Sequence, residues 1–216
     1  MNLQTNDFFE LEGFQHSKLF DGTTNPWEVL GQALIDYIAA NIQPGIHGRV
    51  MDGAWLMSDR IEIGEGTIVE PGAMIKGPAI IGRNCEIRHT AYLRENVIVG
   101  DNCVIGHATE IKASVLLNHV EAAHFAFVGD SVVGGHAMLG AGTRLANFKV
   151  DGSEVIVYAP NCNIRTGLTK FGAIVGDGCK FGCNSVSNPG TILGKGCIIM
   201  PCTAAKGCLP AGTRVK

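Results

Sequence analysis

Charged and aromatic residues are scarce in this sequence, at 17% and 6% of its 216 residues. No run approaches the roughly 20 apolar residues needed to cross a membrane, and the first residues carry neither the basic nor the apolar segment of an export signal. A formal net charge of −3 lacks the basic excess that attracts nucleic acid or anionic lipid. Disorder is excluded for most of the chain because 46% of it is hydrophobic. We therefore expect a folded, cytoplasmic protein that binds neither nucleic acid nor membranes.

The chain also lacks the CxxC motifs that hold structural zinc, although it contains 8 cysteines. Without an export signal, these thiols are expected to stay reduced. The sequence separation between Cys85 and Cys103 recurs between Cys179 and Cys197. This regular spacing favours small buried side chains stacked on one another over zinc ligands or disulfides.

Aliphatic residues recur at every sixth position in the central part of the chain. Ten consecutive positions of this frame are Ile63, Val69, Ile75, Ile81, Ile87, Leu93, Val99, Ile105, Ile111 and Leu117. The frame slips by one residue near Val128 and returns after residue 172. A period of six fits neither the 3.6-residue turn of a helix nor the two-residue alternation of a strand. It predicts a triangular solenoid with three short strands per coil, three repeats to a coil, and coils about 4.8 Å apart. The two cysteine pairs are each separated by the length of one such coil.

Hexapeptide repeats of this kind resemble those of left-handed parallel β-helices. From that resemblance we expect an all-β, single-stranded left-handed parallel β-helix over residues 51–216, with residues 1–50 as an N-terminal helical cap segment. Helical spacing of apolar residues after Asn25-Pro26 predicts a helix over 26–42, which we expect to cover the open end of the solenoid. Residues 146–172 break the frame and predict a loop excursion.

A zinc site is one alternative, because the pair His119 and His124 has one feature of the γ-class carbonic anhydrases, which are also left-handed β-helices. That family places a third histidine a whole number of coils upstream. The positions one and two coils before His119 are Asp101 and Arg83. Without a third imidazole we do not favour zinc, and we expect no metal ion to be required.

Two cationic side chains are expected to stack on adjacent coils, because Arg94 and Lys112 are separated by the length of one coil. At a separation of about 5 Å and an effective dielectric constant near 20, they repel by about 3 kcal/mol. A phosphate between them would offset that repulsion; the alternative is two solvated side chains that point apart.

A carboxylate and a histidine lie close to these cations in the frame. Glu110 precedes Lys112 by two residues and so shares its strand face, and His124 follows on the next coil. A histidine oriented by a carboxylate is suited to act as a general base near neutral pH. Glu110 and His124 are therefore candidate catalytic residues.

The segments around these residues resemble a known family. They are Tyr92-Leu93-Arg94, Glu110-Ile111-Lys112, His124-Phe125-Ala126-Phe127-Val128-Gly129-Asp130 and Gly140-Ala141-Gly142-Thr143. They are similar to the acetyltransferase domain of the bifunctional N-acetylglucosamine-1-phosphate uridylyltransferase/glucosamine-1-phosphate acetyltransferases. The stretch 140–147 and the motifs over 172–196 look closer still to the archaeal sugar-1-phosphate nucleotidylyltransferases with the same C-terminal domain.

This resemblance implies a trimeric enzyme of the hexapeptide-repeat transferases. It would move an acetyl group from acetyl-CoA to the amino group of an amino-sugar 1-phosphate or a nucleotide-linked amino sugar. Arg94 and Lys112 match the family's sugar-phosphate ligands. His124 matches its general base, and Glu110 matches the carboxylate that pairs with that base.

Further positions match the family, and others depart from it. Asn147 matches an asparagine near the acyl and acceptor groups, while Ala141 and Cys183 match residues that line the acetyl-CoA site between subunits. Phe127 stands where the family has an acceptor-binding tyrosine, and Met138 stands where it has an asparagine. Losing such donors weakens acceptor binding or changes the acceptor.

Two further expectations concern function. A trimer that binds a phosphosugar or nucleotide sugar without acyl transfer is the alternative to an enzyme, consistent with Phe127 and Met138. The glycine-rich signature of a nucleotidyltransferase is absent, so we do not expect nucleotidyl transfer from this chain. A separate nucleotidyltransferase chain stays open as a partner.

Overall fold

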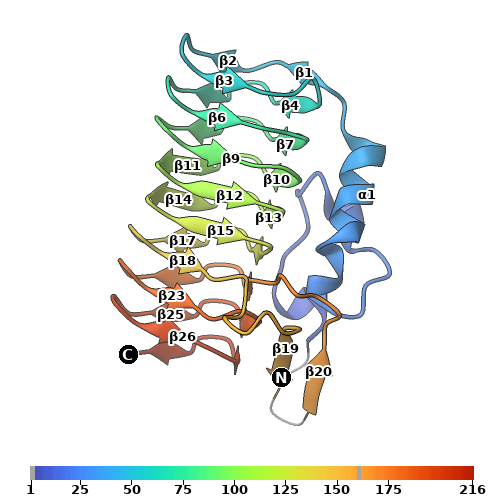
Figure 1. Cartoon of the computed structure of the whole chain (residues 1–216), viewed down its shortest axis with the longest axis vertical. Coiled ribbons are helices and arrows are strands. Elements are labelled where there is room, and N and C mark those ends of the chain that lie inside the picture. Colours follow the sequence, from blue (N-terminus) through green and yellow to red (C-terminus); the bar gives the residue numbers. More distant parts are fainter. Residues whose placement is uncertain (1–2, 160–161) are drawn as a thin grey trace.

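The computed structural model describes residues 3–159 and 162–216. From residue 45 onward the chain winds into a solenoid with three parallel sheets along its length, the expected left-handed β-helix (Figure 1). Each full coil supplies one short strand to each sheet, and the strands of neighbouring coils pair in parallel.

The three sheets are named here in the order in which the chain enters them. Sheet 1 contains β1 (Gly45–Ile46), β4 (Ile61–Ile63), β7 (Ala79–Ile81), β10 (Val97–Val99), β13 (Ser114–Leu116), β16 (Val132–Val133), β21 (Ala173–Val175), β24 (Thr191–Leu193) and β27 (Cys208–Leu209). Sheet 2 contains β2 (Arg49–Val50), β5 (Ile68–Val69), β8 (Glu86–Ile87), β11 (Val104–His107), β14 (Glu121–His124), β17 (Met138–Leu139), β22 (Lys180–Phe181), β25 (Ile198–Ile199) and β28 (Arg214–Val215). Sheet 3, which faces the viewer in Figure 1, contains β3 (Trp55–Leu56), β6 (Met74–Ile75), β9 (Tyr92–Leu93), β12 (Glu110–Lys112), β15 (Phe127–Gly129), β18 (Arg144–Leu145), β23 (Val186–Ser187) and β26 (Ala204–Ala205).

One side chain per strand points into the solenoid and forms its core, and it is aliphatic in most strands, with Phe181 in β22 and Ser187 in β23 as exceptions. The six-residue frame predicts these side chains correctly from Ile63 to Ile111, but it is wrong at Leu117. Leu116 points inward instead, because the corner at Ala113 has one residue fewer than the corresponding corner of the preceding coil, and Ser114 pairs with Val97. The corner at Asp130 is shortened in the same way, which is the slip expected near Val128.

The N-terminal segment lies along the side of the solenoid, not over its open end as we expected (Figure 1). It contains η1 (Thr5–Asp7), η2 (Ser17–Phe20), η3 (Pro26–Val29) and α1 (Gln32–Asn41). The expected helix over 26–42 is broken at Gly31, which has a φ of 65°.

The reason for this position is the composition of sheet 1, whose strands from β7 to β24 carry apolar outward side chains as well as apolar inward ones. The outward side chains Ile80, Ile98, Val115, Val132, Ile174 and Ile192 are buried under aromatic and aliphatic residues of the N-terminal segment, including Phe8, Trp27 and Leu34. A sheet that is apolar on both faces must be covered on both.

The chain leaves the solenoid after β18 and returns at β21. Between them an antiparallel hairpin forms from β19 (Ile156–Ala159) and β20 (Cys162–Arg165), beside the C-terminal coils (Figure 1). Within the described residues, no helix has the length and apolar character of a membrane span.

Candidate active site

One column of side chains runs along the corner between sheets 2 and 3, with one member from each of five successive coils. The column consists of His89, His107, His124, Ala141 and Cys183. The same backbone hydrogen bond recurs at each step, for example from Phe125 N to His107 O (2.9 Å) and from Asn184 N to Ala141 O (2.8 Å). The expected base His124 therefore lies directly before the two expected acetyl-CoA residues.

Hydrogen bonds orient the two histidines that precede His124. His89 Nδ1 lies 2.7 Å from Pro71 O, and His107 Nδ1 lies 3.1 Å from His89 O. Because a carbonyl oxygen only accepts, Nδ1 is the donor in each of these two contacts. The two rings stack with centroids 5.6 Å apart. His124 is exposed, and no hydrogen bond to its ring forms within the described residues, so its imidazole is open to a substrate.

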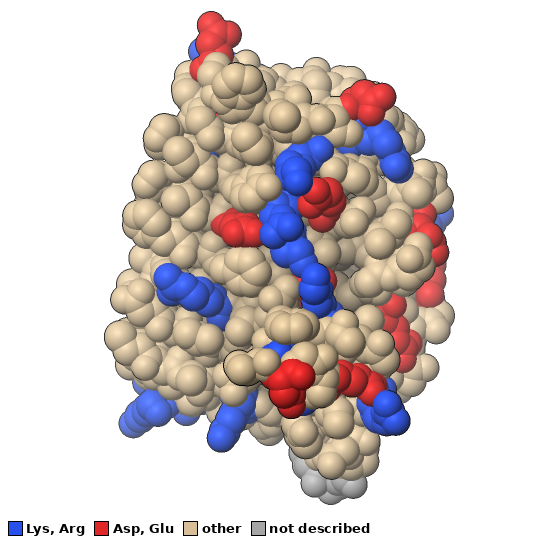
Figure 2. All heavy atoms as spheres, in the orientation of Figure 1, with Lys and Arg blue, Asp and Glu red and all other residues tan. Residues whose placement is uncertain are grey.

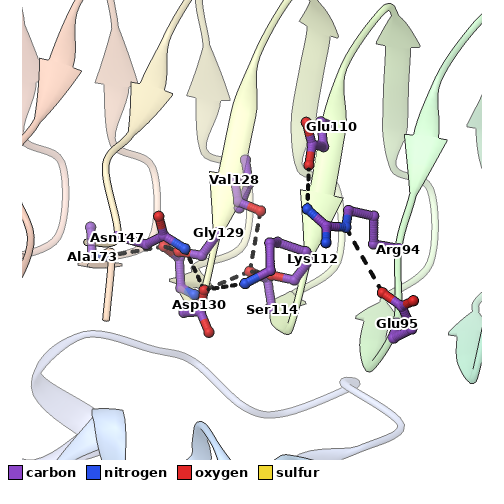
Figure 3. Close-up of polar contacts among 11 residues, drawn as sticks. Arg94, Glu95, Glu110, Lys112, Ser114, Val128, Gly129, Asp130, Asn147 and Ala173 are labelled. Atoms are coloured by element: carbon purple, nitrogen blue, oxygen red, sulfur yellow. Dashed lines mark hydrogen bonds and ion pairs between the residues drawn. The ribbon is translucent and has the colours of Figure 1, made fainter. Parts of the chain in front are cut away.

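The expected hydrogen bond between Glu110 and His124 is not formed among the described residues. Glu110 Oε1 instead accepts a hydrogen bond from Arg94 Nη1 at 3.0 Å (Figure 3). β9 and β12 bring these side chains together across one coil of sheet 3, while His124 ends β14 of sheet 2 at the corner between sheets 2 and 3. The hydrogen bond to Glu110 raises the pKa of Arg94, so the guanidinium stays charged.

Lys112 belongs to a second cluster at the far edge of sheet 3 (Figure 3). Lys112 Nζ lies 2.8 Å from Asp130 Oδ2, and the same oxygen accepts a hydrogen bond from Asn147 Nδ2 at 2.5 Å. The Lys112 and Asp130 side chains are only 16% and 11% exposed. Asp130 thereby fixes two of the residues expected to bind substrate.

Each of the two stacked cations has a carboxylate partner. Arg94 pairs with Glu110 and Lys112 pairs with Asp130, so no bound phosphate is needed to explain why the two cations stack. Figure 2 shows basic and acidic side chains interleaved along this face. Donors nevertheless remain: Arg94 Nε is buried, with Glu95 Oε2 3.8 Å away, but Arg94 Nη2 makes no hydrogen bond among the described atoms. Lys112 has further N–H groups besides the one on Asp130.

The two departures from the family lie on different faces. Phe127 projects from β15, and a Cβ placed on Gly129 would lie 2.8 Å from Phe127 Cζ and 2.7 Å from Asn147 Nδ2. The hydroxyl of a tyrosine at this position would therefore lie near the Asn147 amide. Phe127 lacks that hydroxyl, so this hydrogen-bond donor is missing from the chain. Met138 is exposed on the outer face of sheet 2.

The residues weighed for zinc form no metal cluster. His119 and His136 stack with ring centroids 4.5 Å apart at the corner between sheets 1 and 2, away from His124. Residues 3–159 and 162–216 contain no group of three His, Cys, Asp or Glu side chains placed to hold a metal ion. Cys85, Cys103, Cys179 and Cys197 are buried free thiols.

Sequence reasoning missed Asp130 and the register of the histidine column. Asp130 follows Lys112 by 18 residues, the same separation as between Arg94 and Lys112, and that spacing was the available signal. The column was missed because the short corner at Ala113 brings His124 to the same position of the coil as His107, one residue earlier than the frame expects.

Comparisons with known proteins agree with this architecture. Residues 75–168 match the GMPPB C-terminal domain family. Uncharacterized acetyltransferase YaiX of Escherichia coli O6:K15:H31 is 35% identical over 191 residues, which cover 86% of this chain and 73% of that protein. The chain belongs to the hexapeptide-repeat acetyltransferases.

This hexapeptide-repeat acetyltransferase is also similar to one longer protein in sequence and to one solved structure in fold. Bifunctional protein GlmU of Methanococcus vannielii is 30% identical over 190 residues, covering 88% of this chain and 45% of that protein. The chain thus spans less than half the length of that relative. UDP-N-acetylglucosamine acyltransferase from Campylobacter jejuni shares the fold, with a TM-score of 0.54 at 14% identity over 75% of this chain and 69% of that one.

Proposed function

We propose that this protein transfers the acetyl group of acetyl-CoA to the amino group of an amino sugar that carries a phosphate, either as a 1-phosphate or linked to a nucleotide. The observation that carries the proposal is the column in which His124 directly precedes Ala141 and Cys183, beside a face that presents Arg94 and Lys112. GlmU and YaiX relatives support the same class of reaction.

In this mechanism His124 acts as the general base. The amine nitrogen attacks the thioester carbonyl carbon while the exposed imidazole accepts the amine proton. The resulting tetrahedral oxyanion collapses, the C–S bond breaks, and the imidazolium returns the proton to the thiolate of CoA. The products are the N-acetylated sugar and free CoA thiol, and no metal ion is required.

The remaining residues bind and orient. Arg94 and Lys112 bind the acceptor phosphate through the N–H groups that their carboxylate partners leave open. Glu110 acts on Arg94 by holding its guanidinium in place, and Asn147 lies near the acceptor. Ala141 and Cys183 line the acetyl-CoA groove, which a second subunit completes in a homotrimer.

The test is thiol release from acetyl-CoA with glucosamine-1-phosphate and with galactosamine-1-phosphate. His124→Ala should lower the rate by 10²- to 10⁴-fold. His107→Ala is the matched control, because it removes the same ring from the preceding coil and should leave the rate within a few-fold. Equal losses in both variants would refute the assignment of the base.

A second candidate function is binding without turnover. It is favoured by Phe127 and Met138, which lack hydrogen-bond donors expected for the acceptor. A phosphosugar that binds in an Arg94-dependent manner, with no thiol release, would support it.

A further inference from the structure

A cavity of about 470 Å³ lies between the hairpin β19–β20 and the last coils, outside the site described above. Here it is called the hairpin pocket, and Lys149, Ile156, Tyr158, Asn188, Gly190 and Lys206 are among its lining residues. Its volume is within the range of small-molecule sites, and the lining is mostly apolar with a few polar groups.

The hairpin forms one wall of this pocket and is held firmly in place. Val155 and Val157 are fully buried against the solenoid, so the alternating residues Ile156 and Tyr158 face the cavity. A Cβ on Gly190 would lie 2.7 Å from Val155 Cγ1, which shows how closely the hairpin approaches the corner of the coil. Tyr158 is 58% exposed and offers a flat aromatic surface.

The hairpin pocket is basic, although the whole chain has a net charge of −3. Lys149 and Lys206 line it, and none of its lining residues is acidic. Lys149 Nζ donates to Ser153 Oγ at 2.5 Å, with Asp151 Oδ1 3.9 Å away, and Lys206 pairs with no carboxylate in the described part of the chain. The cations of the active site each have a carboxylate within 3.0 Å, whereas the carboxylate beside Lys149 is 3.9 Å away and Lys206 has none within the described ranges, so these lysines favour a bound anion.

The pocket lies on the same edge of sheet 3 as the expected phosphate ligands. Strand pairing aligns Lys112 with Gly129, and the pairs β15–β18, β18–β23 and β23–β26 continue that column to Ala146, Asn188 and Lys206. Three steps of about 4.8 Å separate Lys112 from Asn188, which is about 14 Å. One diphosphate cannot bridge that distance, so the pocket takes a group distinct from the phosphate at Lys112.

We propose that the hairpin pocket binds a nucleotide, with its base against Tyr158 and its phosphate held by Lys149 and Lys206. An aromatic ring joined to a phosphate matches a cavity whose lining combines an exposed tyrosine, an amide side chain and two lysines and contains no acidic residue. The proposal rests on the proposed function only for the source of the nucleotide. That source is either the adenosine bisphosphate end of CoA, with the acceptor phosphate at Lys112, or the nucleoside diphosphate of a nucleotide-linked acceptor, which is then held in this pocket and not at Lys112.

The test is equilibrium binding to the full chain, with no turnover required. The probes are adenosine 3′,5′-bisphosphate, uridine diphosphate and inorganic phosphate. Lys206→Gln and Tyr158→Ala should each weaken nucleotide binding about tenfold or more. Lys180→Gln, an exposed lysine on sheet 2, is the matched control and should leave binding unchanged.

The probes identify the source of the nucleotide. Tighter binding of the adenosine bisphosphate assigns the pocket to the acyl donor, and tighter binding of uridine diphosphate assigns it to the acceptor. Inorganic phosphate should bind more weakly than either nucleotide, because it lacks the base. Failure of both nucleotides to bind, or equal binding to wild type and both pocket variants, overturns the proposal.

The failure of this proposal can be distinguished from failure of the proposed function. Nucleotide binding that depends on Lys206, without thiol release, supports the pocket and counts against acyl transfer. Thiol release without nucleotide binding does the reverse.

Discussion

The ion pair between Lys112 and Asp130 gives a quantitative test of how the site is held. At 2.8 Å and an effective dielectric constant of about 20, the direct attraction is about 6 kcal/mol, most of which offsets the cost of desolvating two largely buried groups. Asp130→Ala leaves the ammonium group without its partner and should lower the free energy of unfolding by about 3 kcal/mol. Lys112→Met should cost about 2 kcal/mol, because Asp130 keeps its hydrogen bond from Asn147.

The double variant should cost about 3 kcal/mol, so the two substitutions are coupled by about 2 kcal/mol. Urea unfolding of the four proteins measures this coupling. The pair Lys149–Asp151, at 3.9 Å on the surface, is the control and should show no coupling. Additive effects of Asp130→Ala and Lys112→Met, within about 0.5 kcal/mol, would refute the view that Asp130 holds Lys112 for phosphate binding.

Three further predictions test packing, pH dependence and specificity. Gly106→Ala should destabilise the protein by about 3 kcal/mol in urea unfolding, because its Cβ would lie 1.5 Å from Ala123 O. The control Gly196→Ala meets no neighbour and should cost only about 1 kcal/mol for its positive φ, so similar costs for the two variants would contradict the packing argument. Burial lowers the pKa of His16 below 6.5, so the folded protein disfavours the protonated ring and stability should be lost as the pH falls below 6.5. In urea unfolding between pH 5 and 8, His16→Phe should flatten this pH dependence of stability, and an unchanged dependence would show that another group causes it. Phe127→Tyr should lower the KM for an amino-sugar 1-phosphate about tenfold, because it supplies a hydroxyl near the acceptor, whereas the control Phe125→Tyr should leave KM unchanged. An unchanged KM in the Phe127 variant would mean that the acceptor does not contact this ring.

The six-residue frame alone determined the solenoid, because an inward aliphatic residue on each short strand is a local requirement that every coil repeats. It also placed Arg94 and Lys112 on adjacent coils, since their separation in the sequence equals the length of the coil that joins β9 to β12. The buried cysteine pairs were predictable for the same reason.

What the frame could not decide depends on register across coils and on packing between distant segments. A single residue missing at Ala113 puts His124 in line with His107, and a single hydrogen bond assigns Glu110 to Arg94 and not to His124. The N-terminal segment packs on sheet 1 because the outward residues of that sheet are apolar. The six-residue frame describes only the inward residues, so it does not predict this packing. Such pairings follow from which atoms meet in three dimensions, and only the tertiary structure decided them.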